Sequence, residues 1–437
     1  MSGWRIALAC MTPAPDTNEL GELRLPSYGI RRILAAVVAD PSLADSSVAL
    51  VDFGTPDVDA YVEAIMRLEP DLVGLSIYVW SMACMVEVAR RIKRQRPHCT
   101  IVFGGPSARP AMFDLPLFAG AHTYLDAVVT TEGEGIFRDI ARLPELSRAS
   151  LRSVQGLQLP ADGVWLQTGH RAPTENLDEI ASPFQLDLMP TGSVAYLESY
   201  RGCPLSCRFC EWGASETARA VFSSDYIERE LQAFARHGAP SVFLLDAGLN
   251  LNAKGFRNLM EAEARVGFLH STVFWAEIYP TLVKEEHLEF LSRVGTSYLG
   301  VGLQSLDPVV LKLHDRPFDR DRFETALDKL KKVANTELQI IFGLPGDTPQ
   351  GFRRTLAYAR SFGVSVRAYH CLVLPDALLT RGRPGWDMRF DPVTMSMQSC
   401  LGWSEDDFLQ TRALLDHEAV ACGGKAGNFW WSFPSTR

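Results

Sequence analysis

Three cysteines lie within eight residues in the segment Arg201-Gly-Cys-Pro-Leu-Ser-Cys-Arg-Phe-Cys-Glu-Trp-Gly213. This segment follows a predicted strand at 194–198, so it forms a loop at the carboxyl end of that strand, where α/β barrels build their active sites. Three thiolates at this spacing can bind three irons of a [4Fe–4S] cluster and leave one iron open. A zinc site completed by a distant histidine is the alternative, although structural zinc usually takes four ligands in paired knuckles. We predict that Cys203, Cys207 and Cys210 are metal ligands.

A repeated strand–helix pattern extends from this segment toward the carboxyl terminus. Strand-like runs are predicted at 194–198, 241–245, 272–277, 298–301, 338–342 and 365–369. Apolar residues at helical spacing occupy 224–237, 253–266, 284–294, 318–333 and 348–362. Six such units over 193–375 predict a partial (β/α)6 barrel, short of the eight units of a closed one. The small region 376–437 is rich in Trp, Gly, Met and Pro, and we expect it to cap the barrel.

A second α/β alternation occupies residues 1–141. Strands are predicted at 5–11, 48–53, 72–78, 100–103 and 127–131, and helices at 28–39, 57–67 and 82–94. This pattern predicts a Rossmann-like or flavodoxin-like parallel sheet, which binds its ligand at the carboxyl ends of the strands. The stretch 142–192 is predicted to be a linker with a hairpin at 154–170.

Composition limits the class of protein. The 437 residues are 47% hydrophobic and 22% charged, which is typical of a globular chain of two or three domains. A net charge of −9 argues against nucleic acid as the main partner. No apolar run reaches the ~20 residues that span a bilayer, and an odd count of nine cysteines argues against a disulfide framework. We expect a cytoplasmic protein with no membrane partner.

The cysteine spacing, with Phe209 just before the last cysteine, resembles the CxxxCxxC motif of the radical S-adenosylmethionine (SAM) superfamily. The resemblance covers about 193–375. It implies that the open iron binds the amino and carboxylate groups of SAM and that reduction of the cluster cleaves the sulfonium. A reductant such as ferredoxin or flavodoxin is the implied partner.

Further segments at strand ends match the family pattern, although packing explains each of them when it is taken alone. The residues expected to contact SAM or the cluster are Phe209, Trp212, Asp246, Gly248, Asn250, Gln304, Ser305, Ile341 and Gly343. The third strand ends in Glu277, but Tyr279 stands where many relatives carry Arg. Because tyrosine cannot supply a bidentate charge, an atypical SAM site is predicted. Glu277 is expected to bind the open iron or to accept a hydrogen bond from SAM or substrate.

Two residues at the end of the sixth predicted strand, Tyr369 and His370, are candidates for proton transfer by their position. The tryptophans of the last region are expected either to stack on an aromatic substrate or to pack against the barrel. They are Trp386, Trp403, Trp430 and Trp431.

The amino-terminal sheet resembles, over about 4–140, the cobalamin-binding domain that precedes some radical SAM barrels. The motifs are Gly74-Leu-Ser-Ile-Tyr-Val-Trp-Ser81, Phe103-Gly-Gly-Pro106 and Val128-Val-Thr-Thr-Glu-Gly-Glu-Gly135. Glycines let a nucleotide tail pass close to the backbone. The expected cobalamin contacts are Ser76, Tyr78, Trp80, Ser81, Gly104, Gly105, Glu132, Gly133 and Glu134. The DxHxxG motif is absent, which predicts no histidine ligand on the lower face of cobalt. A dimerisation domain is the alternative.

These resemblances imply a cobalamin-dependent radical SAM methyltransferase, which moves a methyl group from SAM via methylcobalamin to a carbon of a small molecule. The sequence Glu277-Ile-Tyr279 is similar to the atypical tryptophan 2-C-methyltransferases of thiopeptide antibiotic biosynthesis, which implies C2 of tryptophan as the acceptor. One alternative is a cobalamin-dependent radical cyclase or rearrangement enzyme without methyl transfer. Another is a cobalamin- or redox-sensing binding protein.

Overall fold

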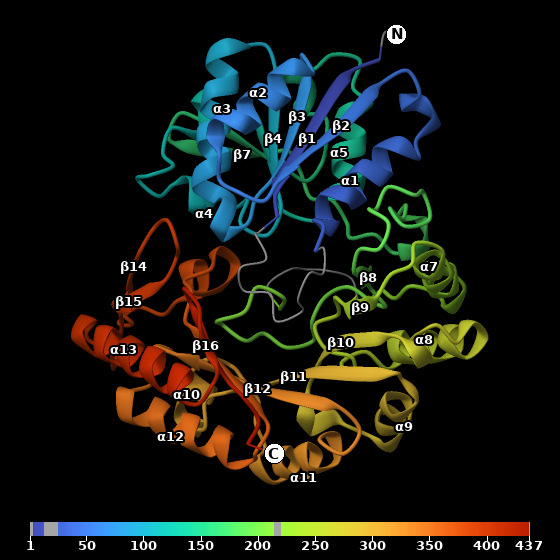
Figure 1. Cartoon of the computed structure of the whole chain (residues 1–437). Helices are drawn as coiled ribbons and strands as arrows, with labels where there is room; N and C mark the ends of the chain where they lie inside the picture. Colours follow the sequence, from blue (N-terminus) through green and yellow to red (C-terminus); the bar gives the residue numbers. More distant parts are fainter. Residues whose placement is uncertain (1–2, 13–24, 214–219, 437) are drawn as a thin grey trace. The chain divides into compact units, whose positions relative to one another are not determined.

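The computed structural model describes residues 3–12, 25–213 and 220–436. The chain divides into two units, Met1–Ser193 and Val194–Arg437, and each unit has its own main sheet with helices around it (Figure 1). Both units are α/β, which confirms the predicted fold class. Among the described residues, no helix combines the length and the apolar character that crossing a bilayer requires.

The sheet of the first unit has the strand order β2-β1-β3-β4-β5-β6-β7. Its strands are β1 (Arg5–Met11), β2 (Ser47–Phe53), β3 (Leu72–Ser76), β4 (Thr100–Gly104), β5 (Ala127–Val129), β6 (Leu157–Ala161) and β7 (Val164–Gln167). The first five strands are parallel in the flavodoxin-like order, whose ligands bind where the order reverses, between β1 and β3. The hairpin predicted within 142–192 is formed by β6 and β7, and it extends the sheet because β6 pairs antiparallel with β5.

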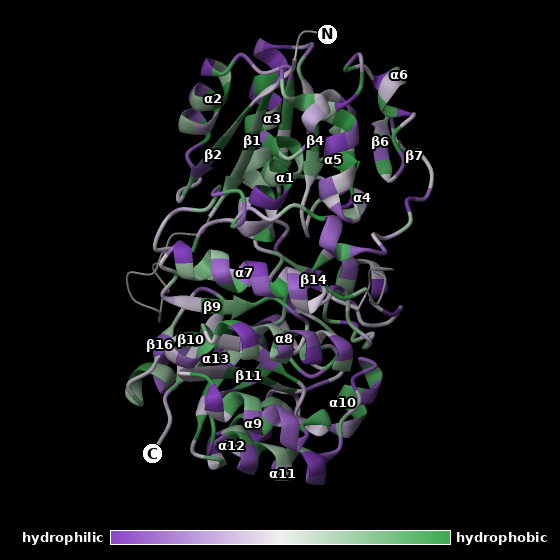
Figure 2. Cartoon of the chain, turned by 90° about the vertical axis from the view of Figure 1, so that its right-hand side faces the viewer, coloured by the Kyte–Doolittle hydropathy of each residue, from purple (hydrophilic) through white to green (hydrophobic). Residues whose placement is uncertain are grey.

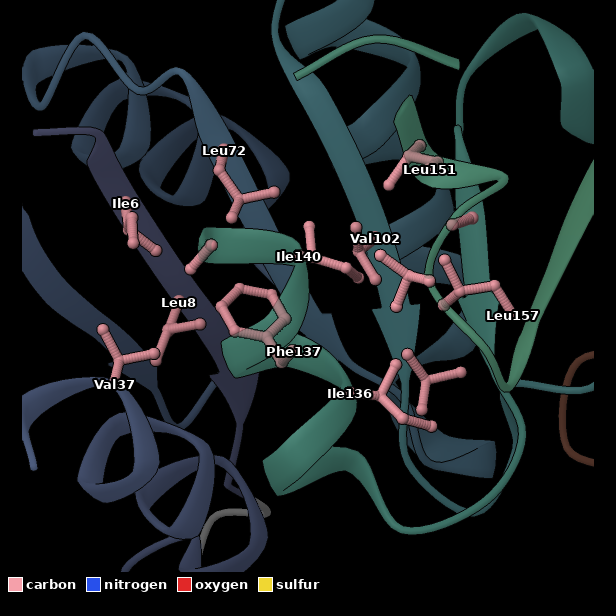
Figure 3. Packing of buried hydrophobic residues seen from close by; sticks show 14 of the residues in the cluster. Ile6, Leu8, Val37, Leu72, Val102, Ile136, Phe137, Ile140, Leu151 and Leu157 are labelled. Atoms are coloured by element: carbon pink, nitrogen blue, oxygen red, sulfur yellow. The ribbon is translucent and has the colours of Figure 1, made fainter. Parts of the chain in front are cut away.

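Helices cover both faces of this sheet, with α1 and α5 on one side and α2 and α3 on the other (Figure 1). The helices are α1 (Tyr28–Val38), α2 (Val58–Arg67), α3 (Met82–Gln95), α4 (Pro110–Phe113), α5 (Gly133–Ala141) and α6 (Arg148–Leu151). Ile6 and Leu8 of β1 pack in one cluster with Ile136, Phe137 and Ile140 of α5 (Figure 3). Each such side chain contributes roughly 1.5–3 kcal/mol when fully buried.

The main sheet of the second unit has the order β16-β17-β13-β12-β11-β10-β9-β8. Its strands are β8 (Ala195–Leu197), β9 (Ser241–Leu244), β10 (Val273–Ile278), β11 (Thr296–Gln304), β12 (Asn335–Phe342), β13 (Ser365–His370), β16 (Lys425–Ala426) and β17 (Trp430–Phe433). The six strands from β8 to β13 are parallel, as the prediction of six β/α units requires. The sheet stays open between β8 and β16.

The helices of the second unit lie on one face of its sheet, which we call the outer face (Figure 1). They are α7 (Ser224–Arg236), α8 (Ala253–Val266), α9 (Glu285–Arg293), α10 (Pro308–Leu313), α11 (Arg320–Leu330), α12 (Pro349–Ser361) and α13 (Glu405–Ala421). Polar N-caps fix several of their starts, since Ser223, Asn252 and Thr348 accept hydrogen bonds from the first turns of α7, α8 and α12. These helices mix hydrophilic and hydrophobic residues (Figure 2).

The carboxyl-terminal region forms part of the barrel sheet. Besides α13 it contains a small hairpin of β14 (Arg389–Phe390) and β15 (Met397–Ser399). Strand β17 then pairs antiparallel with β13 and extends the sheet past its sixth parallel strand. The last strands of 376–437 therefore belong to the main sheet, and the capping role of this region stays a prediction.

Alternating burial separates two faces along each barrel strand. On β12, Leu338, Ile340 and Phe342 are fully buried, and Phe342 packs against Phe352 of α12 on the outer face. The other face of the strand, which we call the inner face, carries Glu337, Gln339 and Ile341. This alternation assigns every other strand residue below to the inner or the outer face.

Candidate functional site

The three clustered cysteines lie in the loop after β8, as predicted. Cys207 is buried, and Cys203 and Cys210 are partly buried. Among the described residues, no three His, Cys, Asp or Glu side chains gather around one point as ligands of a single metal ion do. In a [4Fe–4S] cluster the cysteine sulfurs do not converge on one atom, because each cysteine binds a separate iron.

Both flanking thiols are protonated at neutral pH in the absence of iron. Burial raises the pKa of Cys203, and it raises the pKa of Cys210 to about 11. Binding of iron therefore releases protons, as it does for other thiolate sites.

Three residues predicted to contact SAM brace the cysteine loop and its neighbouring strand ends. The buried carboxylate of Asp246 accepts hydrogen bonds from the backbone N–H of Ser199, at 2.8 Å, and from its hydroxyl. The Tyr200 hydroxyl donates to the Gly248 carbonyl at 2.7 Å. Asn250 binds both backbone groups of residue 279, donating to its carbonyl at 2.8 Å and accepting from its N–H at 2.9 Å. These contacts use polar atoms of the three residues within the fold, and a contact with SAM stays a prediction for each of them.

Glu277 lies on the inner face of β10, close to the carboxyl end of the strand. Its Oε1 accepts a hydrogen bond at 2.9 Å from Gln339 of β12, across the intervening strand β11. Gly300 of β11 makes this possible, because a β-carbon there would overlap both the Glu277 carboxylate and the Gln339 amide. Burial raises the pKa of Glu277, while Gln339 and the Arg316 charge oppose that shift.

Arg316 supplies the positive charge that is missing at position 279. Its guanidinium lies over the Tyr279 ring, 4.6 Å from the ring centre. One amino group donates to the Gly302 carbonyl at 2.7 Å, and the other lies 3.9 Å from the Cys207 Sγ. The Tyr279 hydroxyl donates to the Pro317 carbonyl, so Tyr279 supports the arginine and is not free to act as an acid. Sequence reasoning missed Arg316 because it follows α10, 37 residues after Tyr279.

The remaining predicted contacts of the barrel divide into two groups. Gln304, which has a left-handed backbone with φ of 67°, and Ile341 lie on the inner face. Ser305 is fully buried, and its hydroxyl accepts from the N–H of Asp307, so it shapes the turn before α10. Gly343 lies against the Phe408 ring of α13, where a side chain would overlap that ring. Ser305 and Gly343 thus have structural roles in the fold, and their contacts with SAM stay predictions.

His370 and Tyr369 point to opposite faces of β13. Tyr369 is on the inner face, in register with Ile341 and Trp430. His370 is buried on the outer face, where its ring stacks on Phe408 and its Nε2 lies 2.7 Å from the Met397 carbonyl oxygen. Burial lowers its pKa to about 4. This burial argues against proton transfer by His370, and its predicted role stays untested.

The aromatic residues near the cysteine loop differ in exposure. The Phe209 ring packs 5.8 Å from the buried His314 ring, and Trp212 is 48% exposed. Among the carboxyl-terminal tryptophans, Trp403 and Trp431 are buried around Phe342 on the outer face, and Trp386 packs on His314. Trp430 lies on the inner face but is covered by Arg367. Packing, the second of the two expectations, describes all four.

In the first unit, the predicted cobalamin contacts lie at the carboxyl ends of β3, β4 and β5. Gly105 has φ of 98° and folds onto Ile77, where a β-carbon would lie 2.7 Å from the Ile77 carbonyl oxygen. A β-carbon on Gly104 would have its nearest neighbour 3.9 Å away, so packing does not require glycine there. Space for a ligand therefore remains beside Gly104. Ser76 is buried at the end of the adjacent strand.

The loop after β3 presents an aromatic surface at the point where the strand order reverses. Tyr78 and Trp80 stack with ring centres 4.5 Å apart, and Trp80 remains 47% exposed. The Trp80 Nε1 donates to the Met11 carbonyl at 3.3 Å, which ties the ends of β1 and β3 together. Ser81 is fully buried and its hydroxyl bonds the Tyr78 backbone, so its predicted contact with a ligand is corrected.

The loop after β5 provides the last predicted group. A carboxylate oxygen of Glu132 accepts from the Thr174 N–H at 2.9 Å, while Gly133 and Glu134 begin α5. Among the described histidines of this unit, His98 and His122 precede β4 and β5, and His170 follows β7. Because Thr168 bonds to Leu157 and Leu157 pairs with Val129, His170 lies toward the same sheet edge as the loop after β5. The absence of a histidine ligand on cobalt stays a prediction.

Comparisons with known proteins match each unit to a family. Residues 197–359 match the radical SAM superfamily, and residues 22–141 match the B12 binding domain. A 2-(S-pantetheinyl)-carbapenam-3-carboxylate methyltransferase from Streptantibioticus cattleyicolor is 28% identical over 82% of this chain and 56% of its own length. The cobalamin-dependent radical SAM methyltransferase TokK from Streptomyces tokunonensis is 28% identical over 71% of this chain and 48% of its own. The chain thus spans about half the length of these curated relatives.

Solved structures share the fold. TsrM from Kitasatospora setae, with cobalamin and a [4Fe–4S] cluster bound, has a TM-score of 0.66 and 15% identity, over 90% of this chain and 84% of that one. OxsB, with aqua-cobalamin and SAM bound, has a TM-score of 0.70 and 13% identity, over 95% and 67%. A radical SAM domain implies a [4Fe–4S] cluster and SAM, and a B12-binding domain implies cobalamin. The chain therefore carries a radical SAM domain at 197–359 and a B12-binding domain at 22–141.

Proposed function

We propose that this protein is a cobalamin-dependent methyltransferase that transfers a methyl group derived from SAM to a carbon atom of a small molecule. The observation that carries the proposal is the grouping of three thiols, one carboxylate and one guanidinium at the carboxyl ends of the barrel strands, in a chain that also has a B12-binding unit. The methyltransferase names of the two relatives at 28% identity support the reaction class.

Cys203, Cys207 and Cys210 would hold the cluster, and Arg316 would hold the carboxylate of SAM. When bound, the cluster supplies electrons and a binding site for SAM, and cobalamin supplies a methyl carrier. Arg316 fits its role because its guanidinium lies beside Cys207, and charge-assisted hydrogen bonds to carboxylates are strong. Tyr279 alone predicts a SAM site without an arginine for the carboxylate, whereas Arg316 would supply one.

Glu277 would act next to Arg316. Gln339 occupies its Oε1, while its Oε2 accepts no hydrogen bond from the described part of the chain. That oxygen is available to the open iron or to an ammonium group of SAM or substrate. Gly300 and Gly302 form the floor beneath these two charged side chains, since side chains at either position would overlap them or Gln304.

In the first unit, Gly104, Gly105 and Ser76 would line the path of the cobalamin tail. The exposed Trp80 ring would lie against the corrin. Aromatic rings bury a large apolar area and suit this contact.

The substrate proposed is a small molecule, and tryptophan is the narrower candidate. Tryptophan is the substrate bound in a solved TsrM structure, whose fold this chain shares. A low-potential donor such as ferredoxin or flavodoxin would reduce the cluster, and the cytoplasm is the compartment that supplies such donors.

The test is anaerobic reconstitution with iron, sulfide and hydroxocobalamin, followed by incubation with methyl-deuterated SAM and tryptophan. We expect S-adenosylhomocysteine and a deuterated methyltryptophan, and neither product with Cys207→Ala. Production of 5′-deoxyadenosine in step with product would identify a radical methyl transfer, and its absence a transfer of the atypical kind. Formation of 5′-deoxyadenosine without S-adenosylhomocysteine would overturn the proposal in favour of a cyclase or rearrangement enzyme. Failure to bind SAM with an intact cluster would favour a sensor.

A further inference from the structure

The segment that follows the sixth barrel strand reaches the cysteine loop, which follows the first. Arg381 lies in this segment, and its guanidinium donates to the carbonyl oxygens of Ser206, at 3.4 Å, of Cys207, at 3.0 Å, and of Cys210. One side chain thus binds three carbonyls of an irregular loop. Buried carbonyls in such loops need partners, because strand pairing is not open to them.

The guanidinium is itself held in place. Its Nε donates to the Asp376 carbonyl at 2.8 Å, which closes a turn within the segment. In the opposite direction, Arg208 of the cysteine loop donates to the Arg381 carbonyl at 3.0 Å. The backbone N–H of Asp376 donates to Glu211 at 3.2 Å. The loop and the segment therefore exchange hydrogen bonds both ways.

Aromatic packing adds a second contact between the same two segments. The His314 ring lies between Phe209 of the cysteine loop, at 5.8 Å, and Trp386, at 4.9 Å. The carbonyl of His314 accepts from the Arg208 N–H at 3.0 Å. The buried Trp386 thus supports Phe209 of the cysteine loop through the His314 ring.

The charge of Arg381 also lies near the thiols. Within one residue, four bonds join the carbonyl oxygen to Sγ, so a group bonded to the Cys207 carbonyl lies within about 8 Å of that sulfur. This distance is no greater than the screening length at physiological salt, and the partly buried site is screened less than water. A positive charge there stabilises the more negative, reduced form of a bound cluster.

We propose that Arg381 is a positioning residue for the cluster. Its planar guanidinium fixes the backbone of the cysteine loop, and its charge favours the reduced state of the cluster. This inference rests on the proposed cluster site. It assigns the start of the carboxyl-terminal region a role in the iron site.

The experiment compares full-length wild type, Arg381→Gln and Arg381→Lys after anaerobic loading with iron and sulfide. Arg383→Gln is the matched control, since Arg383 lies in the same segment, pairs with Asp315 at 3.7 Å and is 42% exposed in its side chain. The rate of iron loss to a chelator measures how firmly the cysteine loop holds the cluster. A redox titration followed by electron paramagnetic resonance measures the potential.

We expect Arg381→Gln to lose iron at least tenfold faster than wild type. We also expect a tenfold smaller ratio of reduced to oxidised cluster at a fixed potential, a midpoint shift of about 59 mV in the negative direction. Arg381→Lys keeps the positive charge but lacks the planar guanidinium. It should therefore have the midpoint potential of wild type but lose iron faster than wild type. Arg383→Gln should behave as wild type in both measurements.

Wild-type iron release and wild-type potential in Arg381→Gln would overturn the inference. If Arg381→Gln does not fold, Arg381→Lys provides the test. Iron release from Arg381→Lys as slow as from wild type would contradict the role of the planar guanidinium. Failure of the proposed function looks different: wild type would then take up no cluster, or Cys207→Ala would take up as much iron as wild type.

Discussion

Replacing Arg316 by glutamine tests whether this arginine holds the carboxylate of SAM. The substitution removes the positive charge beside Cys207 and leaves the Tyr279 ring without its cation. Hydrogen bonds to charged groups contribute about 1.5–3 kcal/mol. Loss of such an interaction corresponds to SAM binding that is about 10- to 100-fold weaker.

The assay is equilibrium dialysis of SAM against anaerobically reconstituted protein, with iron measured in the same samples. Arg316→Lys keeps the charge without the planar fork, so its dissociation constant should lie between those of wild type and Arg316→Gln. Arg322→Gln is the control, because Arg322 is exposed on α11 and pairs only weakly with Asp319, at 3.5 Å. A dissociation constant within twofold of wild type in Arg316→Gln, at equal iron content, would refute the reasoning.

Three further predictions concern residues whose roles the structure changed or sharpened. Burial raises the pKa of Asp246 to about 7, so the folded protein binds this proton more tightly than the unfolded chain, and stability should fall as pH rises from about 4 to 7 and then level off. In Asp246→Asn, the free energy of unfolding should decrease by on the order of 2 kcal/mol less between pH 5 and 7 than in wild type. Urea unfolding at both pH values measures this difference, and an unchanged pH dependence would contradict the assignment. His370→Ala should cost about 2–4 kcal/mol of stability through lost packing but leave the pH profile of the reaction unchanged, whereas loss of one limb of that profile would restore its role in proton transfer. Trp80→Ala should weaken cobalamin retention about tenfold in gel filtration followed by absorbance, while Leu166→Ala, on the exposed strand β7, should retain it; equal retention in both variants would exclude the Trp80 contact.

Local patterns predicted most of the fold because local interactions decide these elements. Apolar alternation and polar N-caps such as Asn252 and Thr348 mark the strands and helices of both units. The hairpin β6–β7 and the strand β17 join their sheets by antiparallel pairing at an edge. That pairing depends on partners far along the chain, such as Trp430 with Tyr369, and short-range patterns do not report it.

The site was predictable only where one segment carries the whole signal. The spacing of Cys203, Cys207 and Cys210 sufficed to predict a cluster loop. Arg316 and Arg381 reach that loop from 106 and 171 residues beyond Cys210, so no motif connects them with it. A polar residue at a strand end, such as Asp246, has the same sequence signature whether it binds a ligand or braces a loop.

The different positions of Tyr369 and His370 have a geometric origin. Side chains alternate between the faces of a strand, so adjacent residues such as Tyr369 and His370 cannot both point inward. Position at the end of a strand predicts closeness to the mouth of the barrel, but only the register of β13 decides which residue faces it.

The most direct measurement is the content of iron and cobalamin in one preparation of the anaerobically reconstituted chain and of its Cys203→Ala/Cys207→Ala/Cys210→Ala variant. A protein that holds its two cofactors in separate units should contain about four irons and one cobalamin per chain, and the triple variant should lose the iron but keep the cobalamin. Iron retained in the triple variant, or wild-type protein that binds no cobalamin, would contradict the assignment of a cluster loop and a B12-binding unit to this chain.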